Sequence, residues 1–457
     1  MANASTYLHR TFTAGNQRKF TGSVWFKRAR LTSGYEKIMQ GRDGSDSYDT
    51  SISFDPTDHI RFESWHNGAY TGGRRHTTRV FRDIAAWTHL VFVVDSENAT
   101  AEDRMQIWIN GVRETSFSTN VACTQDTDFY INKAGATNYI GSHSGSTDAN
   151  CFTGQFAHYH FCDGQAYSAS DFGEFDSTSG IWVAKTSPSV TYGENGFFLK
   201  FASGASGTDS SGEGNNMTVV GTLTNNKDNP DNNFCTANPL DNYYTDYTFS
   251  NGNCTWTKAN TAETFTTATV YLSSGLWYFE QEVTDNGVND NMQVGIASVV
   301  SLTGGAGSYL GYPANTYGYN GGGGQVYNGT SGGTFGNLST YTTGDIIGVY
   351  LDLNANKIYF GKNGTIQNSG TGYDITAAAS TASGFYSPAF GSNSGASETK
   401  IFSLNFGNGY FGTTAISGAV ADAGGEGQFK YNPSTGTFDG SSKDFRAICT
   451  KNIATYG

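Results

Sequence analysis

The stretch GDIIGVYLDLNANKIYFGKNGT, residues 344–365, predicts two antiparallel strands joined by a tight turn. Apolar and small or polar residues alternate along it with the period of two that a half-buried strand requires. The residues expected on the core face are Ile347, Val349, Leu351, Leu353, Ile358 and Phe360, and those expected to face outward are Gly348, Tyr350 and Asp352. Asn363-Gly364 predicts a second turn, because both residues tolerate the positive φ of a type I′ turn. A hairpin explains every residue type in this stretch. We therefore interpret it as part of the structural scaffold, with no need for a catalytic residue.

The composition favours β-structure along the whole chain. The 457 residues include 59 Gly, 27 Tyr and 31 Phe but only 7 Pro, and charged residues make up 15%. The typical charged share of a soluble domain is about 25%, so Ser, Thr, Asn and Gly must supply much of the polar surface. Such a composition suits strands with many turns and argues against long helices.

Alternating segments occupy residues 20–115 and again about 275–411, with an Asn110-Gly111 hairpin in the first group. Between them, residues 203–238 are rich in Gly, Asn and Asp and predict a domain end followed by a linker. We therefore predict an all-β protein with two antiparallel β-sandwich domains of the jelly-roll type. Their predicted bounds are 1–222 and 240–412, with a linker at 223–239 and an irregular C-terminal tail at 413–457.

Charge and hydropathy exclude several classes of partner. The net charge is −13, whereas phosphate binding requires a clustered basic footprint, so we expect no nucleic-acid binding. No stretch approaches 18 apolar residues, and the N-terminal MANASTYLHRTFT lacks the pattern of a secretory signal, so we expect no membrane insertion. The six cysteines are scattered and are interpreted as small buried hydrophobes, although a Cys235–Cys254 pair stays open.

The first half resembles the laminin-G-like, concanavalin A-type jelly roll. The segments that carry the resemblance are FTGSVWFKR (20–28), AAWTHLVFVVD (85–95), MQIWINGVRE (105–114) and FTGQFAHYHFCDGQAYS (152–168). The second half resembles a SPRY domain, through GLWYFEQEV (275–283), VGIAS (294–298), the opening stretch and YSPAFGS (386–392).

The tandem of the two halves resembles virion proteins of marine tailed phages. It opens in STYLHRTF (5–12) and closes in DFRAICTKNI (444–453). This resemblance implies a structural protein of the virion, either a tail-fibre or receptor-binding protein or a capsid decoration, that is synthesised in the bacterial cytoplasm. It also implies symmetric assembly or a homo-oligomer, with other virion proteins as partners.

Candidate binding residues are aromatic and basic side chains in two loop-like segments. They are Trp65, His66, Tyr70, Arg74 and Arg75 in SWHNGAYTGGRRH (64–76), and Tyr312, Tyr317, Tyr319 and Tyr327 in the glycine-rich segment that follows residue 308. Aromatic faces stack on sugar rings or peptide surfaces at a low entropic cost. Packing of these tyrosines on their own glycines, or against another subunit, is the alternative.

A calcium site is one further possibility, and no cofactor is required. Asp43, Asp46 and Asp49 could supply oxygen ligands, but their spacing is not that of an EF-hand loop, and a solvated acidic loop is the alternative.

Two pairs of carboxylates are candidates for the acid and nucleophile of a glycoside hydrolase. Glu174 and Asp176 form only part of a glucanase-type motif, and Glu280 and Glu282 are expected on a polar sandwich face. We therefore predict a non-enzymatic virion protein that binds a host-surface glycan or protein, or other virion proteins, through sandwich loops. The alternative is a glycoside hydrolase or carbohydrate-binding module of a jelly-roll family.

Overall fold

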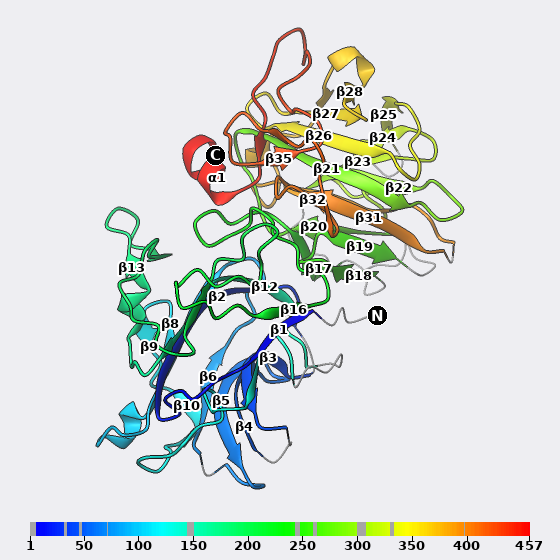
Figure 1. Ribbon diagram of the computed structural model, residues 1–457. Coiled ribbons are helices and arrows are strands. Elements are labelled where there is room, and N and C mark those ends of the chain that lie inside the picture. Colours follow the sequence, from blue (N-terminus) through cyan, green and yellow to red (C-terminus); the bar gives the residue numbers. More distant parts are fainter. Residues whose placement is uncertain are drawn as a thin grey trace. The chain divides into compact units, whose positions relative to one another are not determined.

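The computed structural model describes residues 6–31, 34–44, 48–70, 72–143, 150–242, 247–258, 263–298, 308–329, 333–396 and 398–457. The chain divides into two compact units, residues 1–225 and 226–457, and both are built from antiparallel sheets (Figure 1). The all-β prediction is confirmed, and the division lies inside the segment 223–239 predicted as a linker. Within the described residues, no helix is long and apolar enough to cross a membrane.

In its described residues, the first unit is a sandwich of an eight-stranded and a six-stranded sheet. The large sheet has the order β10 (Phe117–Val121), β6 (Arg74–Val80), β5 (His59–His66), β4 (Tyr48–Phe54), β3 (Glu36–Arg42), β11 (Thr137–Ile140), β1 (Tyr7–Thr11), β16 (Thr218–Val220). The small sheet has the order β15 (Phe197–Leu199), β12 (Gly154–Asp163), β2 (Lys19–Arg28), β7 (Thr88–Asp95), β8 (Met105–Ile109), β9 (Val112–Arg113). A hairpin of β13 (Gly173–Phe175) and β14 (Trp182–Ala184) and two 3₁₀ turns, η1 (Ala101–Asp103) and η2 (Ala169–Asp171), lie outside these sheets.

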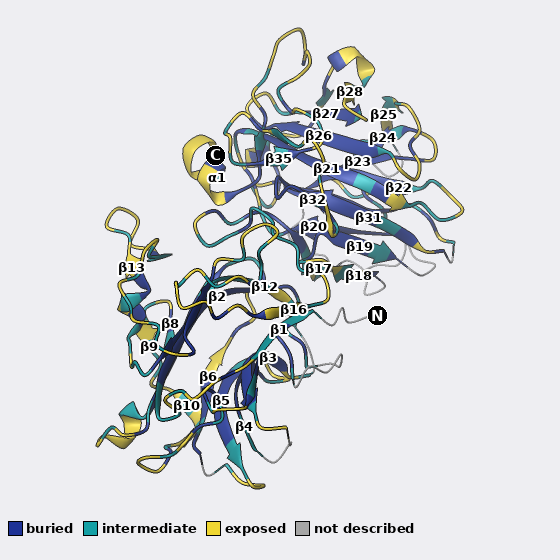
Figure 2. Ribbon diagram, in the orientation of Figure 1, coloured by how far each residue is buried: buried dark blue, intermediate teal, exposed yellow. Residues whose placement is uncertain are grey.

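The alternation seen in the sequence builds the core between these sheets. Ile52 lies opposite Phe62 and Phe54 opposite Ile60, and all four side chains are buried. Figure 2 shows buried residues along the strands and most exposed residues in the connections. Asn110 and Gly111 have φ values of 47° and 82°, as the predicted type I′ turn requires.

The described residues of the second unit form a seven-stranded and a nine-stranded sheet. The first has the order β17 (Ala237–Asn242), β20 (Thr264–Ala268), β30 (Ser387–Ser392), β22 (Met292–Ala297), β23 (Thr316–Asn320), β24 (Gln325–Tyr327), β25 (Thr334–Asn337). The second has the order β18 (Tyr247–Ser250), β19 (Thr255–Lys258), β31 (Lys400–Asn405), β21 (Leu276–Asp285), β26 (Ile346–Asp352), β27 (Lys357–Lys362), β28 (Thr365–Ile366), with β29 (Tyr373–Asp374) on β27 and β36 (Arg446–Ala447) on β21. Short hairpins β32 (Tyr410–Phe411) with β33 (Thr414–Ala415) and β34 (Val420–Ala421) with β35 (Gln428–Phe429), turns η3 (Asn368–Gly370) and η4 (Ala378–Ser380), and helix α1 (Thr450–Tyr456) complete it.

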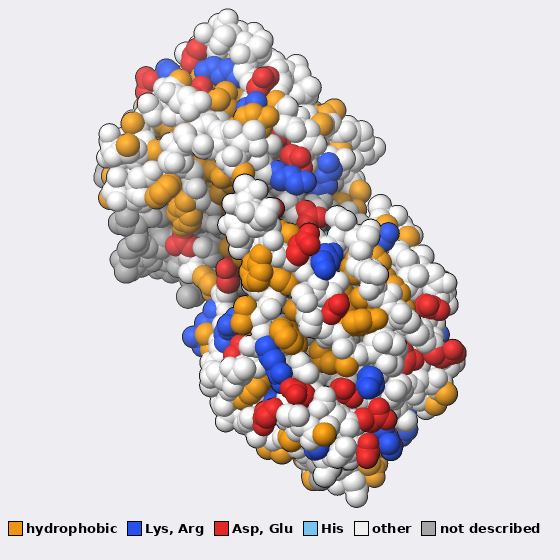
Figure 3. Space-filling model, turned by 90° about the vertical axis from the view of Figure 1, so that its left-hand side faces the viewer, with side chains coloured by type: hydrophobic (Ala, Val, Ile, Leu, Met, Phe, Trp, Pro, Cys, Tyr) orange, Lys and Arg blue, Asp and Glu red, His pale blue; other side chains and the backbone are white. Residues whose placement is uncertain are grey.

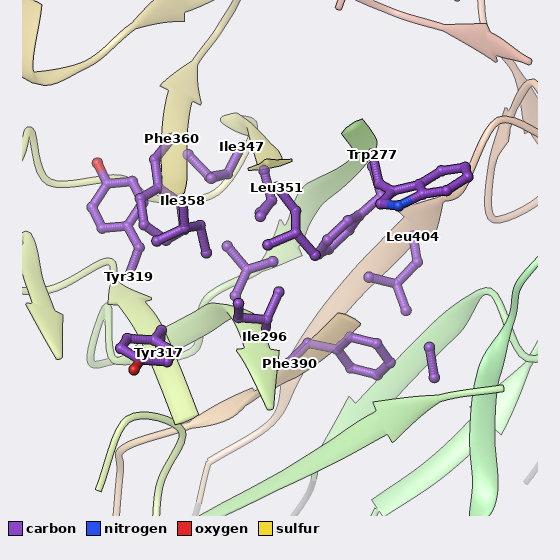
Figure 4. Close-up of a cluster of buried hydrophobic side chains, with 14 of the residues drawn as sticks. Trp277, Ile296, Tyr317, Tyr319, Ile347, Leu351, Ile358, Phe360, Phe390 and Leu404 are labelled. Atoms are coloured by element: carbon purple, nitrogen blue, oxygen red, sulfur yellow. The ribbon is translucent and has the colours of Figure 1, made fainter. Parts of the chain in front are cut away.

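The stretch 344–365 forms the predicted hairpin of β26 and β27. Leu351 lies opposite Ile358, and both belong to the core cluster between the two sheets (Figure 4). Asn363 and Gly364 have φ values of 49° and 81°, so the second turn is also confirmed.

The predicted outward face of this hairpin is covered by the C-terminal segment. Tyr278, Tyr350 and Tyr359 are at most 2% exposed and form one buried cluster. Their partners in the segment 413–457 include Phe429, Phe438 and Phe445, and β36 pairs in parallel with the first residues of β21. The segment is irregular, as predicted, but it forms a third layer on the sheet. Tyr350 lies on the outer face of the sheet, as predicted. The C-terminal segment covers this face, so Tyr350 is buried.

The segment before β17, predicted as part of a linker, is also packed into the second unit. Phe234 is 1% exposed and bridges Cys449, and the Cys235 amide donates to the Ile448 carbonyl at 2.9 Å. All six cysteines are buried and none is in a disulfide, which confirms their interpretation as small hydrophobes and leaves Cys235 and Cys254 unbridged.

Glu280 fixes the C-terminal segment to the sheet. The sequence predicts Glu280 on a polar sandwich face, and in the structure its side chain is fully buried among polar partners. Its carboxylate accepts hydrogen bonds from the backbone amides of Lys430 and Tyr431, both at 2.9 Å, and from Tyr278 Oη at 3.0 Å and Asn405 Nδ2 at 3.1 Å. Burial raises the pKa of Glu280 to about 7.

Because of this raised pKa, the free energy of unfolding depends on pH. Because the folded value of about 7 exceeds the ordinary 4.5, the contribution of Glu280 is full below pH 4.5 and lost as pH rises through 7. We expect Glu280→Gln to remove this slope, so that the wild type gains roughly 2–3 kcal/mol relative to the variant between pH 8 and pH 5. Urea unfolding of both proteins across this range measures the difference. Parallel pH profiles would contradict the assignment.

Candidate functional site: the polar face of the large sheet

Four strands of the large sheet of the first unit carry polar side chains on the face opposite the core. Residues directly opposite one another in antiparallel strands share a face. The paired residues form three cross-strand rows, which together we name the polar face: Lys37–Ser53–Arg61–His76, Gln40–Ser51–Glu63–Arg74 and Arg42–Asp49–Trp65. A register shift between Lys37 and Met39 lets both Lys37 and Gln40 join the same face.

Glu63 is the centre of the charged network on the polar face. Its Oε2 atom lies 2.8 Å from Arg61 Nη2, 3.2 Å from His76 Nε2 and 3.4 Å from Arg74 Nε. Although burial raises the pKa of Glu63, the hydrogen bond with His76 and the charge of Arg61 together hold it below its usual value. Glu63 is therefore an anion held in one position.

Strands β3 and β4 add further donors and acceptors in fixed positions. Lys37 Nζ donates to Ser51 Oγ at 3.0 Å, and burial lowers the pKa of Lys37. Gln40 Nε2 donates to Asp49 Oδ2 at 2.7 Å, and burial raises the pKa of Asp49. The polar face thus holds carboxylates, amides, hydroxyls and cations in a fixed arrangement. Most of these side chains are buried, and the more accessible ones at this face include the half-buried Trp65, Tyr70 and Arg74.

Aromatic rings flank these polar groups. The rings of Trp65 and Tyr70 meet edge to face with centroids 4.3 Å apart, and the Arg74 guanidinium lies 4.1 Å from the Tyr70 centroid. Arg61 lies 4.9 Å from the ring of Tyr35, which is 38% exposed. Next to the third row, a cavity of about 330 Å³ is lined by Arg42, Asp43, Gly44, Gly135, Thr137 and Tyr139.

The structure brings three of the predicted residues of the first unit together and separates two. Tyr70 contacts both Trp65 and Arg74 at the polar face. His66 contacts Ser64 Oγ at 2.8 Å and the ring of Tyr130, and it belongs to none of the three rows. Arg75 lies opposite Phe62 on the core side of β6 and is 1% exposed. Binding by these side chains stays a prediction.

In the second unit, two of the four predicted tyrosines are not surface residues. Tyr317 and Tyr319 lie on β23 and are 4% and 0% exposed, and Figure 4 shows both in the core cluster. Their expected placement on a surface loop is therefore wrong. Tyr312 is 39% exposed, and Tyr309 links it to Tyr327 through ring contacts.

The calcium prediction gains no support from the described aspartates. Asp43 pairs with Lys133 at 3.1 Å, Asp49 is bound by Gln40, and Asp46 lies outside the described residues. Within the described ranges, no group of three or more His, Cys, Asp or Glu side chains could hold a metal ion. Calcium binding stays a prediction.

The carboxylates considered for hydrolysis have local roles. Glu174 is exposed on the β13–β14 hairpin. Asp176 accepts hydrogen bonds from the backbone amides of Thr178 and Ser179 and so closes the turn of that hairpin. Sequence reasoning considered Asp49 only as a calcium ligand and missed Glu63; the two residues are diagonal neighbours on β4 and β5, roughly 7–8 Å apart. Alternation in YDTSISF and HIRFESW could have placed both on the outward face.

Ser23 and His89 form a buried hydrogen-bonded pair that lacks the arrangement of a catalytic nucleophile and its base. Trp182 Nε1 donates to His89 Nδ1 at 3.0 Å, so Nδ1 is the acceptor and Nε2 carries the proton. Nε2 then donates to Ser23 Oγ at 2.8 Å, and burial lowers the pKa of His89 to about 3. A histidine in this state cannot accept the serine proton.

Charges of both signs are mixed on the surface that Figure 3 shows. Lys and Arg side chains lie among Asp and Glu side chains rather than in one patch. This face offers no continuous basic surface for a phosphate backbone. The absence of nucleic-acid binding stays a prediction.

Two family models match the chain, one in each unit. The model described as the concanavalin A-like lectin/glucanases superfamily matches residues 3–171, and the SPRY domain model matches residues 276–405. The chain contains a concanavalin A-like domain followed by a SPRY domain. Both are β-sandwich families that serve mainly as binding or structural modules.

Solved structures similar to the chain include SPRY domains and a pentraxin. The SPRY domain of human HERC1 is 19% identical with a TM-score of 0.31, and the match covers 37% of this chain and 96% of that one. A human SPRY domain is 23% identical with a TM-score of 0.25, covering 33% and 90%. A heptameric SAP-like pentraxin from Limulus polyphemus is 15% identical with a TM-score of 0.25, covering 40% and 86%. No curated protein matches the chain.

Proposed function

We propose that the protein is a non-enzymatic virion component of a tailed phage that binds a host-surface glycan through its concanavalin A-like domain. The observation that carries the proposal is the polar face, where three cross-strand rows hold donors and acceptors beside Trp65 and Tyr70. Sugar hydroxyls both donate and accept hydrogen bonds, and pyranose rings stack on aromatic faces. A face with fixed groups of both kinds and an aromatic flank suits such a ligand better than an apolar peptide.

The virion setting rests on the resemblance of the tandem of two domains, with its segments STYLHRTF and DFRAICTKNI, to virion proteins of marine tailed phages. In this setting the protein is made in the bacterial cytoplasm, joins other virion proteins and is present in symmetric copies, on the tail or as a capsid decoration. Mass spectrometry and antibody labelling of purified virions test it. Absence of the protein from the particle would overturn the virion proposal and leave glycan binding to be judged separately.

Trp65→Ala will weaken glycan binding by roughly tenfold or more, as loss of a central aromatic contact does. The measurement is affinity for the glycans that the wild type binds on an array of bacterial surface polysaccharides. Trp108→Ala is the matched control, because Trp108 is a half-buried tryptophan on β8 of the other sheet. Equal affinities of the Trp65 and Trp108 variants would contradict the assignment of the polar face, and binding of a surface protein instead would replace the glycan as the ligand.

A further inference from the structure

A second cavity, of about 320 Å³, lies at one edge of the concanavalin A-like sandwich. Its lining includes Arg75 on β6, Phe117 on β10, Met105 on β8, Arg113 on β9, Glu102 on η1 and the nearby Glu114. Successive side chains of a strand point to opposite faces, so Arg75 lies on the core side of the sheet whereas Arg74 belongs to the polar face. The edge cavity and the polar face are therefore separate places on the domain.

Arg75 is a buried cation with two unused donors. It is 1% exposed, its Nη1 atom donates to Glu102 Oε2 at 2.8 Å, and its guanidinium lies 5.2 Å from the Phe117 centroid. Its Nε and Nη2 atoms find no hydrogen-bond partner in the described part of the chain. These two N–H groups lie side by side and form the fork that binds two neighbouring oxygen atoms. Because an unsatisfied buried charged donor is costly, the fork is a candidate contact for two neighbouring oxygen atoms.

The same cavity contains a carboxylate, Glu114, that lacks a hydrogen bond at one oxygen atom. Glu114 Oε2 is buried and accepts no hydrogen bond from the described residues, although Arg79 Nε lies 3.3 Å away as an ion-pair partner. Asp103 is paired with Arg113 at 2.7 Å. A phosphate or carboxylate ligand would bring a negative charge among the carboxylates of Glu102, Asp103 and Glu114. A vicinal diol can accept from the Arg75 fork and also donate to a carboxylate.

We propose that this edge cavity binds a neutral pyranose through two adjacent hydroxyl groups. Their oxygen atoms accept from Nε and Nη2 of Arg75, and one hydroxyl donates to Glu114. The site is independent of the polar face and of the virion setting. A dissociation constant of about 1–10 mM is what a single sugar unit reaches.

Methionine methyl NMR on the full chain tests this site directly. Met105 lines the cavity, whereas Met292 lies in the core of the SPRY domain and serves as the internal control. We expect methyl pyranosides of glucose, galactose or mannose to shift the Met105 resonance in a saturable way and to leave Met292 in place. Trp65→Ala will keep this response, which separates the test from that of the polar face.

Arg75→Lys keeps the charge but removes the fork, and we expect it to weaken sugar binding by roughly tenfold. Glu114→Gln is a second variant of nearly the same shape and will also weaken binding, and unchanged Met39 and Met292 resonances show that each variant is folded. The proposal is overturned if no neutral pyranoside shifts Met105, if both variants bind as the wild type does, or if only methyl glucuronide binds.

Discussion

A chain that ends at residue 412 will lose the folded SPRY domain. Removing residues 413–457 uncovers Tyr278, Tyr350 and Tyr359 and takes away their partners Phe429, Phe438 and Phe445. Burial of one phenylalanine side chain stabilises by roughly 1.5–3 kcal/mol. Loss of three such side chains approaches the whole stability of a domain, about 5–15 kcal/mol. The truncation also leaves the buried Glu280 carboxylate without the amides of Lys430 and Tyr431.

Hydrogen exchange followed by mass spectrometry measures this loss domain by domain. In the truncated chain, peptides from 277–405 will exchange as unfolded, whereas peptides from 20–95 will stay protected. Phe438→Ala, which needs no truncation, is expected to cost about 3–5 kcal/mol. Phe385→Ala is its matched control, because Phe385 is 44% exposed. Full protection of 277–405 in the shortened chain would show that the C-terminal segment is not part of the folded domain.

Arg28→Ala will destabilise the concanavalin A-like domain by about 3–5 kcal/mol, because Glu36 and Asp58 lose the buried cation that joins them and keep only the more exposed Arg30 and Arg82. The Arg28 side chain is fully buried and contacts Glu36 Oε2 at 3.2 Å and Asp58 Oδ1 at 2.9 Å, with a further hydrogen bond of 2.7 Å to the Phe81 carbonyl. Burial raises the pKa of Glu36 even with Arg28 in place. The loss will shrink as pH falls towards 4.5, since a protonated Glu36 no longer requires a cation.

Arg82→Ala is the control for Arg28→Ala. Arg82 contacts the same aspartate, Asp58, at the same 2.9 Å, but its side chain is 58% exposed. An exposed ion pair contributes about 0–1 kcal/mol. Hydrogen exchange of peptides from 20–95 compares the two variants. Equal effects of the two substitutions would contradict the prediction that the buried Arg28 stabilises the domain more than the exposed Arg82 does.

Local patterns explain why much of the fold could be predicted from the sequence. The hairpin at 344–365 follows from alternation and from the positive φ that Asn363-Gly364 accepts, and neither depends on distant residues. The error at Tyr317 and Tyr319 came from reading Tyr beside Gly as a loop. The two tyrosines are two positions apart in TYGYN, and this period of two places them on one face of β23.

The candidate sites were harder to predict because their partners are distant in sequence. Glu280 is buried by amides 150 residues further along the chain. Arg74 and Arg75 are neighbours in sequence, and only the register of β6 against β5 assigns one to the polar face and the other to the edge cavity. The proximity of Asp49 to Glu63 could not be predicted, because it comes from the pairing of β4 with β5.

The most direct test of the central claim, that the polar face binds a glycan without cleaving it, is mass spectrometry of a bound glycan after prolonged incubation. We expect the wild-type protein to retain the glycan and release it intact, and Trp65→Ala to retain little. Shorter fragments that form with the wild type and disappear with Glu63→Gln would contradict the account, because Asp49 and Glu63 would then act as the carboxylate pair of a glycoside hydrolase.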